Sequence, residues 1–209
     1  MKKVFSGILL LLLWTAVMLQ LFLMLQNRVF PIGETLIRFF SYFTILTNTL
    51  CAVYFTAAFF ERSWTRQPGW LTALTLYIFV VGLVYQLVLR KLWEPTGLQQ
   101  WVDELLHSVN PLLVFFYWIA YERKHELKYS MVPGWLIYPL VYLLYILIRG
   151  NISGFYPYPF LQVPQIGLRQ VLMNSGLLLA GFILLSTILI YAGSRKTGSK
   201  TVIKNSLEE

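Results

Sequence analysis

Long apolar segments alternate with short polar segments along the whole chain. Six of these segments have roughly the length that an α-helix needs to cross the hydrocarbon core of a bilayer, about 20 residues. They cover residues 5–26, 36–60, 70–90, 101–121, 132–149 and 168–192. The gaps between them hold most of the charged residues. The pattern therefore predicts an all-α, polytopic integral membrane protein with one six-transmembrane-helix bundle over residues 1–192.

The two ends of the chain differ in character. The first apolar segment follows a basic start, MKK, as in a secretory signal peptide, but its apolar run is longer and no small-x-small cleavage motif follows it. We therefore interpret it as the first membrane helix. Residues 193–209 are polar and basic, and we expect them to form a flexible cytoplasmic tail.

Composition agrees with a membrane bundle. Of the 209 residues, 57% are hydrophobic and only 12% are charged, which is about half the charged fraction of a soluble domain. The gaps leave no room for a soluble domain. The single cysteine, Cys51, lies inside an apolar segment and is interpreted as a small packing residue.

Lys and Arg are distributed unequally between alternate gaps, and this predicts the orientation. One side of the membrane, which includes the N-terminus, carries eleven: Lys2, Lys3, Arg62, Arg66, Arg123, Lys124, Lys128, Arg195, Lys196, Lys200 and Lys204. The other side carries six: Arg28, Arg38, Arg90, Lys91, Arg149 and Arg169. Because cytoplasmic loops are enriched in Lys and Arg, we expect an N-in/C-in topology. The net charge of +8 is then a topology signal, and no motif indicates a nucleic-acid partner.

Polar residues form a stripe in the second apolar segment. Ser41, Thr44 and Asn48 follow i, i+3, i+7 spacing, which places them on one face of a continuous helix, and Thr47 lies beside that face. Such hydroxyl and amide groups often bond their own helix or join two membrane helices. The alternative is a functional pocket, and the pattern leaves both interpretations open.

The fourth apolar segment begins with DELLHSVNPLL, residues 103–113. Pro111 has no N–H, so the carbonyl of His107 loses its helical donor and the helix is weakened there. Asp103 lies four residues before His107, on the same side of a helix, where its carboxylate could hold one ring nitrogen. The equally weighted alternative is a histidine that only bonds a neighbouring helix, with Asp103 among the lipid headgroups.

A third polar and aromatic region follows the fifth segment. The glycines and prolines of RGNISGFYPYPFLQVPQIGLRQ, residues 149–170, disfavour a regular helix. Its aromatic residues predict either an interfacial belt or a lid over an entrance from the bilayer. With the N-in topology this region, Thr44, His107 and Asn174 all fall at one level of the outer half, which predicts a single pocket.

Three motifs carry a family resemblance. FSYFTILTN, HSVNP and GFYPYPFL resemble segments of the androgen-induced transmembrane family and its bacterial six-helix relatives, the Pr-six-Pr membrane proteins, and the likeness extends over residues 1–192. Animal members hydrolyse fatty acid esters of hydroxy fatty acids with a threonine in the second span and a histidine in the fourth. The resemblance implies Thr44 and His107 as these residues, with Thr47 one helical turn away as the alternative nucleophile. It also implies a bacterial cytoplasmic (inner) membrane.

The resulting hypothesis is a membrane-embedded threonine hydrolase that cleaves lipid esters. A threonine hydroxyl needs a base within hydrogen-bond reach, and a histidine suits that task; Asp103 is the candidate that orients it. An oxyanion needs donors, for which the amides of Asn48, Asn110 and Asn174 are candidates. Ser41 and Tyr158 complete the auxiliary or substrate-binding set. The partner is a membrane lipid or lipid-like ester that enters from the bilayer.

A different class of function suits part of the same pattern. An intramembrane histidine near acids also fits a proton-coupled transporter, or a lipid-binding module without chemistry. A haem or metal site is disfavoured because the only other histidine, His125, lies in the charged gap ERKHELK and no CxxC motif occurs. We therefore expect no cofactor, and the sequence favours no particular oligomeric state.

Overall fold

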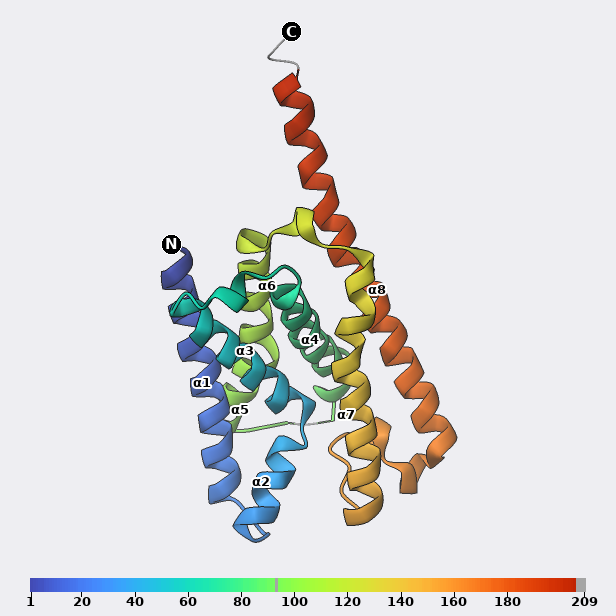
Figure 1. Ribbon diagram of the computed structural model, residues 1–209. Helices are drawn as coiled ribbons and strands as arrows, with labels where there is room; N and C mark the ends of the chain where they lie inside the picture. Colours follow the sequence, from blue (N-terminus) through green and yellow to red (C-terminus); the bar gives the residue numbers. More distant parts are fainter. Residues whose placement is uncertain (93, 206–209) are drawn as a thin grey trace.

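The computed structural model describes the backbone of residues 1–92 and 94–205 and the side chains of residues 1–92 and 94–193. Over these ranges the chain is all-helical, without a β-strand (Figure 1). The main helices are α1 (Lys2–Gln26), α2 (Ile32–Phe40), α3 (Phe43–Phe59), α4 (Trp70–Val84), α5 (Leu98–Glu104), α6 (Asn110–Tyr121), α7 (Val132–Ser153) and α8 (Val163–Asn205). Two π-helical turns, η2 (Tyr85–Leu89) and η3 (Leu105–Val109), extend α4 and join α5 to α6. Short 3-10 turns are η1 (Ser63–Arg66), η4 (Lys124–Glu126), η5 (Tyr129–Met131) and η6 (Pro159–Leu161).

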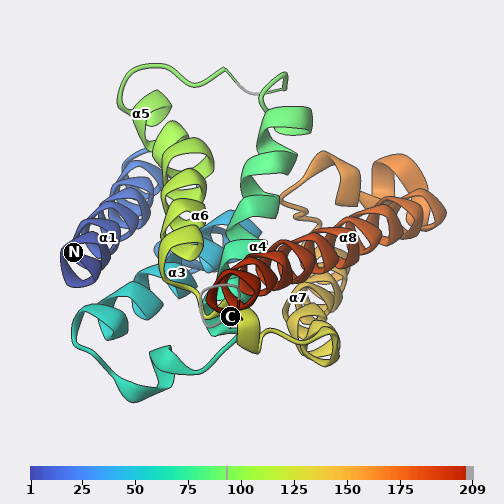
Figure 2. The same ribbon diagram turned by 90° about the horizontal axis from the view of Figure 1, so that it is seen from above.

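The helices pack around α4. This helix contacts α3, α6 and α8 and is buried along most of its length. In Figures 1 and 2, α1 lies on one side of this centre and α7 and α8 lie on the other. Large apolar side chains such as Leu11, Leu144 and Leu177 are exposed on the outer surface, as expected of helices that face lipid.

Four helical runs in the described residues are long and apolar enough to cross a membrane: Lys2–Gln26, Trp70–Leu89, Tyr129–Ser153 and Val163–Gly193. The bent pair α2 and α3 makes a fifth if it is counted as one span. The helix that runs from α5 to α6 is not among them, and it carries Asp103, Glu104, His107 and Asn110. The structure is thus that of a helical membrane protein with four or five such helices by length and composition.

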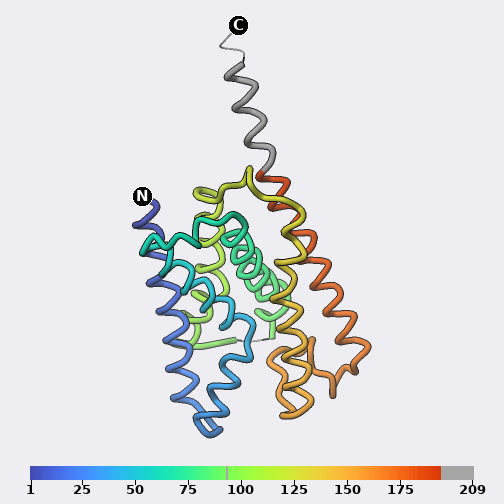
Figure 3. Tube along the Cα trace, in the orientation of Figure 1, coloured from blue at the N-terminus to red at the C-terminus, as the bar shows by residue number. Residues whose placement is uncertain are grey.

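The second apolar segment, residues 36–60, is not the single helix that its hydropathy predicts. Helices α2 and α3 meet at an angle of 77°, and Tyr42 between them has an extended backbone. The bend between the two helices can be followed along the chain in Figure 3. The Tyr142 hydroxyl donates to the Ser41 carbonyl (2.9 Å), and the Ser41 hydroxyl donates to the Ile37 carbonyl (2.7 Å). These bonds satisfy polar groups that the break releases. Ser41 and Thr44 therefore do not share one helical face, because the helix ends between them.

The fourth apolar segment contains the predicted weak point. The helix takes the π-helical turn η3 around His107, and the Asn110 N–H bonds the Leu105 carbonyl five residues back. Pro111 has no N–H for the His107 carbonyl, and the wider turn accommodates that loss. The freed carbonyl packs against α4 at Gly82, where an added Cβ would lie 3.1 Å from it. A glycine on α4 thus lets the two helices approach closely at the histidine.

The irregular region predicted over residues 149–170 is shorter in the structure. Helix α7 continues to Ser153 and α8 begins at Val163, with a kink at Gly167. That prediction was wrong at both ends, because a helix tolerates glycine in its interior and proline in its first turn. What remains irregular carries Tyr156 and Tyr158, both buried. The predicted tail over 193–209 falls almost wholly outside the residues whose side chains are described, and its flexibility stays a prediction.

Candidate functional site

Thr44 lies in the first turn of α3, immediately after the break. In that turn a backbone N–H has no carbonyl of its own helix to bind, and the Thr44 N–H donates to the Tyr158 hydroxyl oxygen instead (3.3 Å). The Thr44 hydroxyl oxygen lies 3.3 Å from Nε2 of His107 and 3.4 Å from the Tyr158 hydroxyl oxygen. The side chain is buried. The structure therefore brings Thr44, His107 and Tyr158 together from three distant parts of the chain.

His107 is held in one orientation by contacts at its other ring nitrogen. Nδ1 lies 2.9 Å from the main-chain carbonyl oxygen of Asp103 and 3.3 Å from Oδ1 of the same residue. A carbonyl oxygen only accepts, so Nδ1 carries the hydrogen, and a neutral ring then presents the lone pair of Nε2 to the Thr44 hydroxyl. The ring of Tyr85 stacks on the imidazole at a centroid distance of 4.2 Å. This is the tautomer that a general base for Thr44 requires.

Asp103 is buried, with 8% of its side chain exposed, so its carboxylate is surrounded by protein. The Tyr85 hydroxyl is a hydrogen-bond partner of its carboxyl group. The neighbouring Glu104 points elsewhere, since it accepts from Ser108 (2.6 Å) and pairs with Arg90. A buried carboxylate is costly without a cation, and an imidazolium at His107 would supply that cation. The carboxylate thus lies where positive charge would develop if His107 took a proton from Thr44.

Two of the predicted oxyanion donors, Asn48 and Asn110, brace the helices. The amide of Asn48 donates to the carbonyls of Thr44 (2.9 Å) and Leu106 (3.3 Å), and the amide of Asn110 donates to Oδ1 of Asn48 (3.0 Å). Both residues are fully buried. They join α3 to the helix that carries His107, and the described contacts include none between either amide and the Thr44 hydroxyl.

The third predicted donor, Asn174, holds a loop. Its amide donates to the Phe160 carbonyl (3.0 Å) and so ties α8 to the segment that carries Tyr158. All three amides thus donate to groups of neighbouring segments, as buried polar groups usually do. Their role as oxyanion donors stays a prediction.

The structure also separates the two threonines of the second segment. The Thr47 hydroxyl lies 3.0 Å from the hydroxyl of Tyr138, on α7, whereas Thr44 contacts His107. Ser41 lies at the break, where its hydroxyl is 3.1 Å from that of Tyr145. Ser41 and Thr47 therefore belong to contacts with α7.

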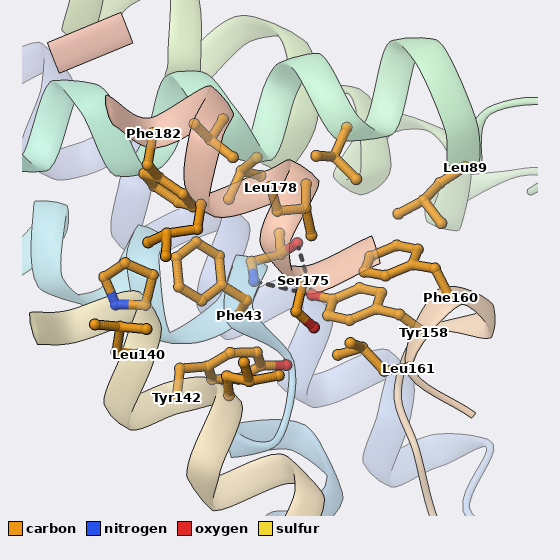
Figure 4. Close-up of a pocket in the computed structure, with 17 residues that line it drawn as sticks. Phe43, Leu89, Leu140, Tyr142, Tyr158, Phe160, Leu161, Ser175, Leu178 and Phe182 are labelled. Atoms are coloured by element: carbon orange, nitrogen blue, oxygen red, sulfur yellow. Dashed lines mark hydrogen bonds between the residues drawn. The ribbon is translucent and has the colours of Figure 1, made fainter. Parts of the chain in front are cut away.

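Two cavities meet at Thr44. The larger, of about 850 Å³, is lined by Thr44, Asp103 and His107 and extends to the loops around Arg28 and Glu94. The smaller, of about 100 Å³, lies between α3, α4, α7 and α8 and has an almost wholly apolar lining (Figure 4). Thr44, Tyr158 and Leu89 line both cavities. Figure 4 shows the Tyr158 hydroxyl with its two dashed hydrogen bonds among the side chains that line the smaller pocket. Thr44 therefore borders two chemically different spaces.

Sequence patterns missed two tyrosines of the site. Tyr85 supports the His107 ring, and Tyr142 satisfies the Ser41 carbonyl at the break. The only signal was an aromatic residue inside an apolar segment, and such residues are too common there to single out. Within the part of the chain that the structure describes, no three His, Cys, Asp or Glu side chains gather as a metal ion would need.

Comparison of the chain with models of protein families, with curated protein sequences and with solved structures found no significant match.

Proposed function

We propose that the protein is a membrane-embedded threonine hydrolase that cleaves lipid esters, with Thr44 as nucleophile and His107 as base. One observation carries the proposal: the Thr44 hydroxyl oxygen lies 3.3 Å from Nε2 of His107, while Asp103 holds the other ring nitrogen. The same three roles recur in Ser-His-Asp hydrolases on unrelated folds. The resemblance to the androgen-induced transmembrane family points to the same threonine and histidine.

The proposed setting is a six-span bundle with both ends in the cytoplasm of a bacterium, embedded in its inner membrane. This requires α2 with α3, and α5 with α6, to count as one span each. Two arrangements in Figure 1 support it: the loops at 60–69 and 122–131, rich in Lys and Arg, lie at the same end as the start of α1, and the loops at 27–31 and 154–162 lie at the opposite end. Thr44 and His107 then belong to the outer half of the membrane.

The reaction follows the usual course of acyl transfer. The Thr44 oxygen attacks the ester carbonyl carbon as its proton passes to Nε2 of His107, and the tetrahedral intermediate collapses with cleavage of the bond to the alcohol oxygen. His107 gives its proton to that oxygen, and the alcohol leaves. Water then attacks the carbonyl carbon of the acyl-threonine as its proton passes to Nε2 of His107. When the bond to the Thr44 oxygen breaks, His107 gives that proton to the Thr44 oxygen and the carboxylic acid departs.

The negative oxygen of the intermediate needs donors, and two groups at Thr44 suit it. The Thr44 N–H lies at the positive end of the α3 dipole, and the Tyr158 hydroxyl is adjacent to it (3.3 Å). An ester carbonyl oxygen bound there would replace the Tyr158 oxygen as acceptor for the N–H and replace Thr44 as acceptor for the Tyr158 O–H. These two donors take the role that the sequence suggested for asparagine amides.

Hydrolysis also needs water at a buried threonine. The larger cavity supports a supply, because its volume of about 850 Å³ far exceeds the share of about 30 Å³ that one water occupies. Polar side chains such as Gln20, Asn27 and Gln99 line its outer part. Water that enters there reaches Thr44 on the side of His107.

The test is hydrolysis of fluorogenic esters by purified protein in nanodiscs. Thr44→Ala should lower kcat about 10³-fold or more, since the nucleophile is lost, and His107→Ala should lower it about 10²- to 10⁴-fold. Thr47→Ala is the matched control, because it removes a buried hydroxyl one turn away that bonds Tyr138, and it should retain activity. Wild-type turnover in both Thr44→Ala and His107→Ala would refute the mechanism.

A transporter or a lipid-binding module is the second candidate, favoured by the size of the larger cavity and by the charged Arg28, Arg38 and Glu94 in its lining. A fluorophosphonate probe separates the two classes. Labelling of the wild type that is lost in Thr44→Ala supports the hydrolase. Solute flux into liposomes without any labelling supports the transporter.

A further inference from the structure

The two cavities at Thr44 differ in what they offer a substrate. The smaller pocket is lined by side chains such as Val81, Leu143 and Phe182, and its polar members are few. The larger cavity carries arginine, glutamate and amide side chains. An ester bound with its carbonyl carbon at the Thr44 oxygen would extend one half into each space.

The position of His107 determines which cavity holds the acyl half of the ester and which holds the alcohol half. His107 and Asp103 line the larger cavity and are absent from the described lining of the smaller pocket. His107 must give a proton to the departing alcohol oxygen and later take one from the attacking water. By microscopic reversibility the water attacks from the position that the alcohol has left. Both therefore occupy the His107 side, and the acyl chain occupies the other.

We propose that the apolar pocket between α3, α4, α7 and α8 holds the acyl chain and that the larger cavity holds the alcohol half. This assignment rests on the proposed hydrolase function and names its substrate class. The substrate is an ester of an apolar acid with a bulky or polar alcohol. In the first step the alcohol leaves by the larger cavity, while the acyl group stays on the Thr44 oxygen with its chain in the pocket.

The size of the pocket sets the selectivity. A volume of about 100 Å³ has room for about three water-sized groups, so it encloses only the first carbons of a chain. Leu140 on α7 lines the pocket yet is 45% exposed, so the pocket reaches the lipid-facing surface of α7. A longer chain extends there into the bilayer. Each enclosed methylene should raise kcat/KM about fourfold, and carbons beyond them should add little.

Two series of esters test the assignment with the full-length protein in nanodiscs. One series varies the acid from acetate to decanoate on a fixed fluorescent alcohol. The other keeps the acid as acetate and varies the alcohol from ethanol to decanol. For the wild type, kcat/KM should climb steeply over the first acyl carbons and vary little along the alcohol series.

Leu178→Trp on α8 fills the pocket (Figure 4), and Leu177→Trp is its matched control, because Leu177 is 76% exposed and does not line it. Leu178→Trp should lower kcat/KM for hexanoate at least about tenfold and leave acetate esters within about twofold. Leu178→Ala enlarges the pocket, so kcat/KM should continue to rise with chain length up to longer acids than in the wild type. Leu177→Trp should behave as wild type.

Two other results overturn the assignment, and they differ in what else they overturn. In the first, Leu178→Trp lowers kcat/KM for esters of the longer alcohols and leaves kcat/KM along the acid series unchanged. The acyl chain then occupies the larger cavity and the alcohol the smaller pocket, although Thr44-dependent hydrolysis stands. If no ester is hydrolysed in a Thr44-dependent manner, the proposed function fails and the assignment fails with it.

Discussion

At the scale of residues, His107 is oriented by two groups of one other residue. The main-chain carbonyl of Asp103 accepts from Nδ1, and the carboxylate lies beside the same nitrogen. In a triad where the carboxylate alone sets the tautomer, replacing Asp by Asn costs about 10⁴-fold in kcat. Here the carbonyl keeps the tautomer whatever the side chain is. In the proposed reaction the carboxylate would therefore contribute mainly by stabilising the imidazolium.

Asp103→Asn should consequently lower kcat about 10- to 10²-fold, less than the loss in His107→Ala, with KM little changed. Steady-state hydrolysis of a short fluorogenic ester measures this. Glu104→Gln is the control, because Glu104 bonds Ser108 and Arg90 rather than the histidine, and its activity should stay within about twofold. A loss in Asp103→Asn as large as that in His107→Ala would mean that the carboxylate, not the carbonyl, sets the tautomer.

At the scale of elements, the break between α2 and α3 frees the Thr44 N–H for a partner outside its own helix. Unpaired backbone groups are tolerated at membrane depth only where protein or a water-filled cavity satisfies them. The Tyr142 hydroxyl donates to the Ser41 carbonyl before the break. The Tyr158 hydroxyl oxygen accepts from the Thr44 N–H after it. The broken helix thus provides a donor that a continuous helix would have used internally.

The segment at 154–162, between α7 and α8, is held by its own anchors so that Tyr158 reaches Thr44. The ring of Tyr156 occupies the space beside Gly150 on α7, where an added Cβ would lie 2.1 Å from it. Asn174 holds the Phe160 carbonyl from α8. The anchors on both sides of Tyr158 make it part of the packed bundle, whereas a mobile lid would lack such contacts.

Gly150→Ala should therefore displace Tyr156 and, with it, Tyr158. The overpacking should cost about 1–3 kcal/mol of stability. Ester hydrolysis should fall because the Tyr158 hydroxyl moves away from Thr44. Gly134→Ala on the same helix is the control, since nothing lies within 4 Å of its added Cβ, and the better helix former should stabilise by about 0.5–1 kcal/mol. Thermal unfolding in detergent and activity measure both. Equal stability and full activity in Gly150→Ala would show that Tyr156 does not anchor the segment.

At the scale of the whole molecule, the helix over 98–121 decides the number of spans. It is the one predicted span that is neither among the four long apolar helices nor in the bent pair, yet it carries His107. Glu104 on this helix bonds Ser108 and pairs with Arg90. Asp103 and His107 instead line the larger cavity, where His107 contacts Thr44, and Asn110 bonds Asn48. A membrane span with such a buried polar side is compatible with the cost of polar groups in a bilayer.

Cysteines on either side of that helix test both the span and the orientation. Cys51 is fully buried and should not react. In intact cells a membrane-impermeant maleimide should label Thr96→Cys, and it should label Ser130→Cys only after permeabilisation; both positions are exposed. Labelling of both from one side would show that residues 98–121 do not cross. The reverse pattern would overturn the N-in topology.

Sequence alone determined what depends on local order. The lengths of the apolar segments gave the positions of most helices, Pro111 marked the weak turn at His107, and the four-residue spacing put Asp103 beside that histidine. These features follow from backbone geometry and nearest-turn contacts, which a short stretch of chain encodes by itself.

Only the tertiary structure decided which polar groups meet. Thr44 and His107 lie 63 residues apart and Thr44 and Tyr158 lie 114 apart, and no periodicity pairs them. In the folded chain the second apolar segment is also broken between Ser41 and Thr44, and the amide of Asn110 donates to Oδ1 of Asn48. Hydropathy reports how apolar a stretch is, whereas the partner of a buried hydroxyl or amide depends on which helix packs beside it.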